Sequence, residues 1–142
     1  MSAFFELRPE VAGQLGEDTT LDTTVHPPHV TFLHYEFDGW LGDDLLESFP
    51  CYVVTKRLEK ALKSAGVGGC SFDLVEVTKS DLFEDLHPNF TLPDFSWLQV
   101  QGAAGVDDFG LSNDHILVVS ESVLTILRSF VFNHCSVEPY RP

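Results

Sequence analysis

Residues 51–71 read CYVVTKRLEKALKSAGVGGCS, and residues 116–136 read ILVVSESVLTILRSFVFNHCS. Aligned without a gap, the two stretches share a Val-Val pair, a hydroxyl residue directly after it, and a Cys-Ser pair at the end. A short apolar run that ends at Thr55 or Ser120 is typical of a buried strand whose last residue caps a helix. These two stretches therefore predict two strand-helix-strand units related as an internal repeat.

The apolar spacing after each hydroxyl residue supports the helices. Aliphatic and aromatic residues recur with the 3.6-residue period of a helix that has one buried face. They are Leu58, Ala61, Leu62 and Ala65 in the first stretch, and Val123, Ile126, Leu127 and Phe130 in the second. Gly66 is predicted to end the first helix. Chance similarity between two common strand-helix-strand units is the alternative explanation.

The rest of the chain predicts further short elements. Residues 30–37 alternate as in a strand, with Val30 and Phe32 on one side and Leu33, Tyr35 and Phe37 on the other. Ser80 is suited to cap a short helix over residues 80–86, residues 97–100 form an apolar strand, and residues 102–110 form a loop. We therefore expect one acidic α+β domain over residues 1–142, with the two units around a mixed or antiparallel sheet.

Composition narrows the class of protein. The chain has 142 residues, of which 44% are hydrophobic and 21% are charged, and its net charge is −14. This apolar content predicts a globular fold, and the chain has no apolar run long enough for a membrane span. Glu6 and Arg8 interrupt the first ten residues, so we expect no signal peptide there. The negative charge repels nucleic acid and anionic membranes and attracts basic proteins. We expect a soluble cytoplasmic protein with a basic protein partner.

Three cysteines argue against a secreted disulfide framework. Cys51, Cys70 and Cys135 give an odd count without a recognisable pairing pattern, so we expect buried thiols in a reducing compartment; a bridge between two of them is the alternative. A nucleophilic Cys135 next to His134 is disfavoured, because adjacent residues of a strand point to opposite faces. No cofactor is expected.

A histidine cluster gives the alternative function. His26, His29 and His34 lie within nine residues, and Glu36 or Asp38 could complete a metal site. Their spacing matches no established zinc pattern, and the Pro27-Pro28 pair holds the first two histidines in an extended segment. A small metal-dependent or hydrolytic enzyme that uses the His26–His34 cluster is therefore the alternative hypothesis.

The favoured function is protein binding. Acidic residues are interleaved with aromatic ones over residues 35–44, a composition suited to a basic partner, although Trp40 and Leu41 could instead cover the core. Phe90 to Trp97 could also join this chain to a larger assembly. The predicted partner-binding residues are Tyr35, Glu36, Asp38, Trp40, Asp43, Asp44, Glu47, Asp107 and Asp108.

The repeated unit also resembles a known class of protein. The strand ends at residues 53–55 and 118–120, each followed by a helix and a second strand, are similar to those of bacterial immunity proteins of polymorphic toxin systems. The resemblance covers about half of the chain. It implies a cytoplasmic inhibitor that binds and blocks a cognate toxin, and it assigns no catalytic residue.

Overall fold

The structure is a computed structural model that describes residues 3–142. Its helices are α1 (Lys56–Ala65), α2 (Asp81–Leu86) and α3 (Glu121–Arg128). Its strands are β1 (Phe4–Arg8), β2 (Gly13–Leu15), β3 (Thr20–Asp22), β4 (His29–Phe32), β5 (His34–Phe37), β6 (Leu45–Ser48), β7 (Cys51–Thr55), β8 (Cys70–Asp73), β9 (Glu76–Lys79), β10 (Phe95–Val100), β11 (Phe109–Leu111), β12 (Leu117–Ser120) and β13 (Ser136–Pro139). The predicted α+β class is confirmed.

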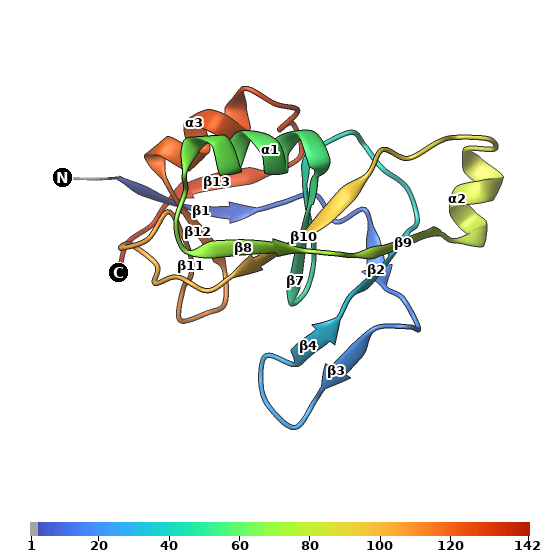
Figure 1. The fold of residues 1–142 in the computed structure, drawn as a ribbon, viewed down its shortest axis with the longest axis horizontal. Coiled ribbons are helices and arrows are strands. Elements are labelled where there is room, and N and C mark those ends of the chain that lie inside the picture. The colour runs from blue at the N-terminus through green and yellow to red at the C-terminus, as the bar shows by residue number, and fades with distance from the viewer. Residues whose placement is uncertain (1–2) are drawn as a thin grey trace.

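Two four-stranded antiparallel sheets repeat one topology. Their strand orders are β6-β7-β10-β8 and β11-β12-β1-β13. In each sheet a hairpin leads into a helix, and the strand after the helix pairs with the far side of a central strand. The helices α1 and α3 lie side by side over the two sheets (Figure 1). The predicted pair of strand-helix-strand units is therefore present.

The repeat also holds at the level of strand register. Leu98 of β10 lies opposite Tyr52 of β7, and Leu7 of β1 lies opposite Leu117 of β12. Tyr52 and Leu117 are equivalent in the aligned stretches, so Leu98 and Leu7 are equivalent too. The central strand of the second unit thus comes from the other end of the chain, next to β13.

Matching side chains start the two helices. The hydroxyl oxygens of Thr55 and Ser120 accept backbone N–H bonds in the first turns of α1 and α3. Each hydroxyl also donates to an aspartate: Thr55 to Asp44, and Ser120 to Asp108 with 2.7 Å between Oγ and Oδ1. Both aspartates directly precede the first strand of their unit, so the duplication includes this hydrogen-bond network.

Longer connections add a further layer to the first unit only. The connection from β1 to β6 spans residues 9–44, whereas the equivalent connection from β10 to β11 spans residues 101–108. Residues 74–94 also separate β8 from β10. These segments supply the β2-β5-β9 sheet, the β3–β4 hairpin and α2, which lie toward the right and lower parts of Figure 1.

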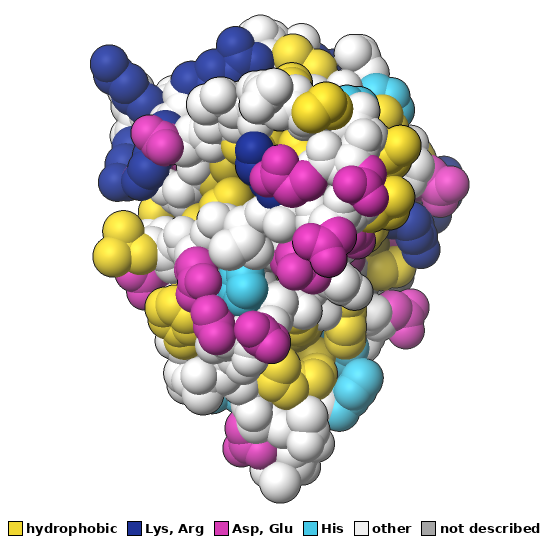
Figure 2. Space-filling model, turned by 90° about the vertical axis from the view of Figure 1, so that its right-hand side faces the viewer, with side chains coloured by type: hydrophobic (Ala, Val, Ile, Leu, Met, Phe, Trp, Pro, Cys, Tyr) yellow, Lys and Arg dark blue, Asp and Glu magenta, His cyan; other side chains and the backbone are white. Residues whose placement is uncertain are grey.

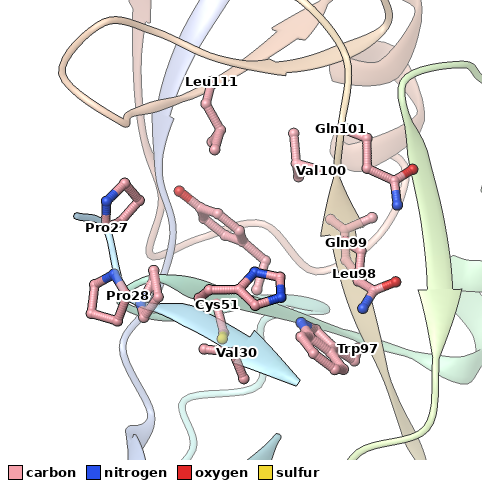
Figure 3. Close-up of a pocket in the computed structure, with 13 residues that line it drawn as sticks. Pro27, Pro28, Val30, Cys51, Trp97, Leu98, Gln99, Val100, Gln101 and Leu111 are labelled. Carbon is pink, nitrogen blue, oxygen red and sulfur yellow. The ribbon is translucent and has the colours of Figure 1, made fainter. Parts of the chain in front are cut away.

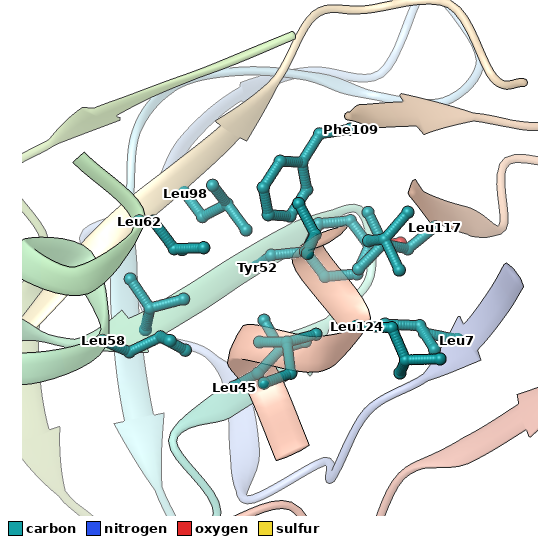
Figure 4. Close-up of a cluster of buried hydrophobic side chains, with 13 residues drawn as sticks. Leu7, Leu45, Tyr52, Leu58, Leu62, Leu98, Phe109, Leu117 and Leu124 are labelled. Carbon is teal, nitrogen blue, oxygen red and sulfur yellow. The ribbon is translucent and has the colours of Figure 1, made fainter. Parts of the chain in front are cut away.

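Two hydrophobic clusters hold the layers together. The first lies among both four-stranded sheets and the helices α1 and α3, where Leu58, Leu98 and Leu124 converge (Figure 4). The second lies between β7 and β10 and the added β2-β5-β9 sheet. Strand β7 is buried along its whole length and contributes to both clusters, which explains its continuous apolar sequence. Each fully buried Leu or Phe contributes about 1.5–3 kcal/mol through burial.

Several predicted boundaries are confirmed and two are wrong. Gly66 caps α1 in a left-handed conformation and Ser80 caps α2, as the sequence predicts. The single strand predicted over residues 30–37 is divided at Leu33, because β4 pairs with β3 whereas β5 pairs with β2 and β9. The loop predicted over residues 102–110 also includes the start of β11, which completes the second sheet.

Candidate partner-binding face

The solvent side of the β2-β5-β9 sheet carries a group of carboxylates. Side chains of β5 alternate, so Tyr35 and Phe37 are buried while His34 and Glu36 lie on the other side. Glu76 of β9 lies opposite His34 and therefore joins the same side. The loop after β2 and the residue after β5 extend the group. We call this group the acidic face; it comprises Glu17, Asp18, Glu36, Asp38 and Glu76.

The acidic face has no Lys or Arg counter-ion within residues 3–142. Carboxylate oxygens of Asp18 and Glu76 lie 3.8 and 3.9 Å from ring nitrogens of His34, and Glu36 accepts a hydrogen bond from the amide of Gln14 at 2.9 Å. Half of the basic side chains of the chain instead lie on α1. Figure 2, which faces this end of the molecule, shows acidic side chains gathered across its middle; most basic side chains lie near the upper left and right margins, and one lies beside acidic side chains in the upper middle. The negative potential here is therefore left for solvent or a partner.

His34 organises the centre of the acidic face. Its ring is buried under the loop that follows β2, with Gly16 directly against it. Its Nδ1 accepts the N–H of Asp18 at 3.2 Å, so the neutral ring carries its proton on Nε2 and donates to Thr78 Oγ1 at 2.6 Å. The imidazole of His34 thus joins the loop after β2 and the strand β9 to β5.

The same residues form a group that could hold a metal ion. One ligand atom each from Asp18, His34 and Glu76 lie within 4.8 Å of one another. Both ring nitrogens of His34 are already hydrogen-bonded, so coordination would replace one of those bonds. Loss of hydration and the neighbouring Asp18 carboxyl raise the pKa of Glu76, although His34 opposes this rise. Because both ring nitrogens of His34 are hydrogen-bonded, this group is better suited to holding the strands and loop of the acidic face together than to binding a metal ion.

The predicted histidine cluster does not come together. His26 packs against Phe49 and His115, with 5.6 Å between the two imidazole centroids. His29 is exposed and lines a pocket that neither His26 nor His34 lines. Among the residues that the structure describes, the three-ligand groups contain His34 and His134 but neither His26 nor His29. The interpretation of His26, His29 and His34 as one site is therefore wrong.

Asp43 and Asp44 were expected on a partner-binding surface, and both are buried. The Asp43 carboxylate accepts the backbone N–H groups of Asn133 and His134 at 3.0 and 2.8 Å. Asp44 accepts the N–H of Val131 at 2.9 Å and pairs with Arg57 at 2.7 Å. These carboxylates join the loop after α3 to the first unit, and their burial contradicts their predicted place on an exposed surface.

Asp107 and Asp108 also accept hydrogen bonds from backbone N–H groups of loops. Asp107 Oδ2 accepts the N–H of Ala103 at 2.8 Å, and Asp108 Oδ2 accepts the N–H of Gly68 at 2.9 Å. Asp108 thus holds the loop after α1, just as Asp44 holds the loop after α3. An aspartate of each unit therefore holds the loop after the helix of the other unit, and we call these reciprocal contacts the clasp. The prediction of these aspartates as a surface charge cluster did not include the contacts.

The other predicted contact residues divide between core and surface. Tyr35 is fully buried, and its hydroxyl donates to the Glu47 carbonyl at 3.0 Å, so its prediction as a contact residue is wrong. Trp40 is half-buried, donates to the Asp43 carbonyl at 2.9 Å and packs edge-on against Phe95. Glu47 is half-buried away from the acidic face, beside Arg8. Glu36 and Asp38 remain on the face, whereas Glu17, Asp18 and Glu76 were missed.

A second three-ligand group lies at the clasp. It consists of Glu10, Asp43 and His134, with 3.1 Å between His134 Nδ1 and Asp43 Oδ1. Glu10 accepts the backbone N–H groups of Leu41 and Asp43 at 2.7 and 3.2 Å. Burial raises the pKa of Glu10, although these two backbone bonds oppose the rise. Backbone donors satisfy this cluster, which fits a structural role.

The thiols are not activated. All three cysteines are free, and Cys51 is buried as predicted whereas Cys70 and Cys135 are half-buried. Burial raises the pKa of Cys51 to about 12, so its thiol stays protonated at neutral pH. Cys51 lines a pocket of about 280 Å³; in Figure 3, Pro27 and Pro28 lie on one side of this pocket, Trp97 and Gln99 on the other, and Cys51 between them. His29 also lines this pocket, but the raised pKa of Cys51 keeps its thiol in the form that is a poor nucleophile.

A scan of the chain against protein-family models finds no matching family. A search of curated proteins finds no significant match either. Within residues 3–142, no helix combines the length and the apolarity that crossing a membrane requires.

Proposed function

We propose that this chain is a non-catalytic protein-binding module whose acidic face binds a basic protein surface. One observation carries the proposal: the segments added to the duplicated scaffold build a sheet whose solvent side holds five carboxylates without a Lys or Arg ion pair among residues 3–142. Scaffold carboxylates of the same chain are bound to backbone or hydroxyl donors. Within residues 3–142, the carboxylates of the acidic face therefore have Gln14 and His34 as side-chain partners but no Lys or Arg that neutralises their charge.

A basic protein is the partner that this charge pattern favours. Neighbouring carboxylates act together, because the screening length at physiological salt is about 8 Å. Such a field speeds encounter with a basic surface and rejects acidic partners. The rigid sheet beneath it, tied by His34, holds the charges in place before binding, which lowers the ordering cost.

Inhibition of a basic toxin is the specific form of the proposal. Its support is the resemblance of the strand-helix-strand units to bacterial immunity proteins, together with the negative charge. In this form the acidic face covers a basic surface of the toxin, and blocking requires no catalytic group on this chain. The cytoplasm is the compartment in which such an inhibitor acts.

Charge reversal tests the proposal. The variant with Glu36→Lys and Asp38→Lys should lose most of its binding to a basic protein captured from a lysate of the source organism at low salt. Association should slow by about tenfold or more at low salt, and the difference should shrink at high salt. Biolayer interferometry with the purified partner measures both rates.

The matched control changes net charge equally at another place. Asp114→Lys with Glu138→Lys alters two exposed acids outside the acidic face and should leave binding nearly unchanged. Equal losses in both variants would show that only net charge matters and would reject a defined face. For the immunity form, expression of the wild-type chain should restore growth of cells that produce the captured partner; absence of any rescue would reject that form.

A further inference from the structure

The strand β9 has an unpaired edge. It pairs in parallel with β5 and is the last strand of its sheet. The N–H groups of Glu76 and Ser80 donate to carbonyls on the β5 side, to Leu33 and Phe37 at 3.0 and 2.9 Å. Because backbone groups of a strand alternate in direction, the N–H and C=O of Val77 point away from β5. An unpaired edge of this kind is a template for an added strand.

An open groove runs beside this edge. It has a volume of about 480 Å³ and lies between β9 and the segment that leads from Phe90 into β10. In Figure 1, β9 continues the direction of β8 toward α2, whereas the chain that enters β10 diverges from it. Lys79 closes one end by donating to the Phe90 carbonyl at 2.6 Å. The edge is therefore uncovered and flanked by a second wall.

Apolar side chains line part of the groove, and each of its two lysines lies near a carboxylate. Val75, Val77 and Leu92 line it and belong to the border of the second hydrophobic cluster. Its two lysines are paired: Lys56 Nζ lies 3.5 Å from Glu59, and Lys79 Nζ lies 3.4 Å from Glu84. Glu59 also pairs with Lys63 at 2.6 Å, so it offsets the charge of Lys56 only in part, whereas Asp94 adds a carboxylate to the lining of the groove.

Sheet geometry then defines the occupant. Side chains of an added strand alternate between the two sides of the sheet. Those on one side lie next to Glu76 and Thr78, on the acidic face, where charge complementarity favours Lys or Arg. Those on the other side lie next to Val75 and Val77, where apolar residues fit. An extended segment in which basic and apolar residues alternate satisfies both sides.

We infer that β9 accepts such a segment of the partner as an added strand. This inference rests on the proposed function and names the form in which the basic partner is held. Main-chain hydrogen bonds along β9 supply part of the affinity, and the alternating side chains supply specificity. The acidic face then acts first by attracting the segment and afterwards by pairing with its basic residues.

A synthetic peptide tests the added strand directly. The probe is a capped heptapeptide of alternating Lys and Val, and its control has the same composition with the four lysines first and the three valines last. On saturation with the alternating peptide, hydrogen exchange at the Val77 amide should slow by about tenfold or more, while exchange at the Thr78 amide, already paired with β5, should stay unchanged. The control peptide should protect Val77 far less. No saturable binding, or equal protection by both peptides, would overturn the inference.

Two variants separate the added strand from the acidic face. Val77→Ala removes the two methyl groups of the side chain and keeps the outward N–H, whereas Val77→Pro removes the outward N–H, which an edge strand tolerates. Peptide affinity should fall by about tenfold or more in Val77→Pro and little in Val77→Ala. If Glu36→Lys weakens binding while Val77→Pro does not, the added strand is refuted and the acidic face stands. The exchange measurement on the wild-type protein decides the matter if Val77→Pro does not fold.

Discussion

At the scale of single residues, burial separates carboxylates that look alike in the sequence. Asp43 and Asp44 are adjacent acids beside a glycine, which is the usual appearance of a solvated pair. Their partners, the backbone N–H groups of residues 131–134, lie some ninety positions away in the chain. Arg57 lowers the pKa of Asp44 even though burial alone would raise it. No local pattern could have shown these contacts.

Glu47 gives a residue-scale prediction on pH dependence. Burial raises its pKa above the ordinary 4.5, and Arg8 opposes the rise only in part. The folded protein thus binds this proton more tightly than the unfolded chain, so ionisation destabilises the fold as the pH rises from about 4.5 through the raised pKa. We expect Glu47→Gln to raise the urea midpoint at pH 7 and to have little effect at pH 4.

The exposed Glu138→Gln variant is the control for that comparison and should show no such difference. A Glu47→Gln midpoint that rises equally at both pH values would point to a packing effect instead of ionisation.

At the scale of elements, the aligned hydroxyls were the most reliable signal. Thr55 and Ser120 were predicted to cap helices, and both do. A helix cap can be predicted from the sequence because its donor and acceptor lie within three residues of each other. The central strand of each unit was harder to predict. The apolar sequence of residues 97–100 indicates a strand, but its place between β7 and β8 depends on pairing with residues far away in the chain. The division at Leu33 was missed for the same reason.

The caps also give a prediction at this scale. Thr55→Ala and Ser120→Ala each remove a helix cap and a hydrogen bond to an aspartate, so each should lower the free energy of unfolding by about 1–2 kcal/mol. Thr55→Ala should cost more, because Asp44 is buried whereas Asp108 is half-exposed. Thr55→Ser keeps the hydroxyl and serves as control. Urea denaturation measures the three, and equal costs at both sites would contradict the role given to burial.

At the scale of the whole molecule, the chain is a duplicated scaffold that carries one added layer. The duplication was visible in the sequence because the strand before the helix and the strand after it belong to one continuous stretch in each unit. The role of β1 was not visible, because the strand that completes the second unit lies at the opposite end of the chain. The acidic face was found only in part, because it joins β5, β9 and the loop after β2.

This arrangement predicts that a circular permutant will fold. Phe4 and Tyr140 already lie side by side, since the Tyr140 N–H donates to the Phe4 carbonyl at 2.9 Å. A short Gly-Ser linker from Pro142 to Ala3, with new ends opened between Gly105 and the exposed Val106, would place β11, β12, α3, β13 and β1 in one continuous run. We expect wild-type circular dichroism, one cooperative urea transition and unchanged Lys-Val peptide binding. A permutant opened between Val53 and Val54, inside buried β7, is the control and should not fold. If the first permutant also failed, the second unit would not be a continuous structural unit, and the account of β1 as the counterpart of β10 would be wrong.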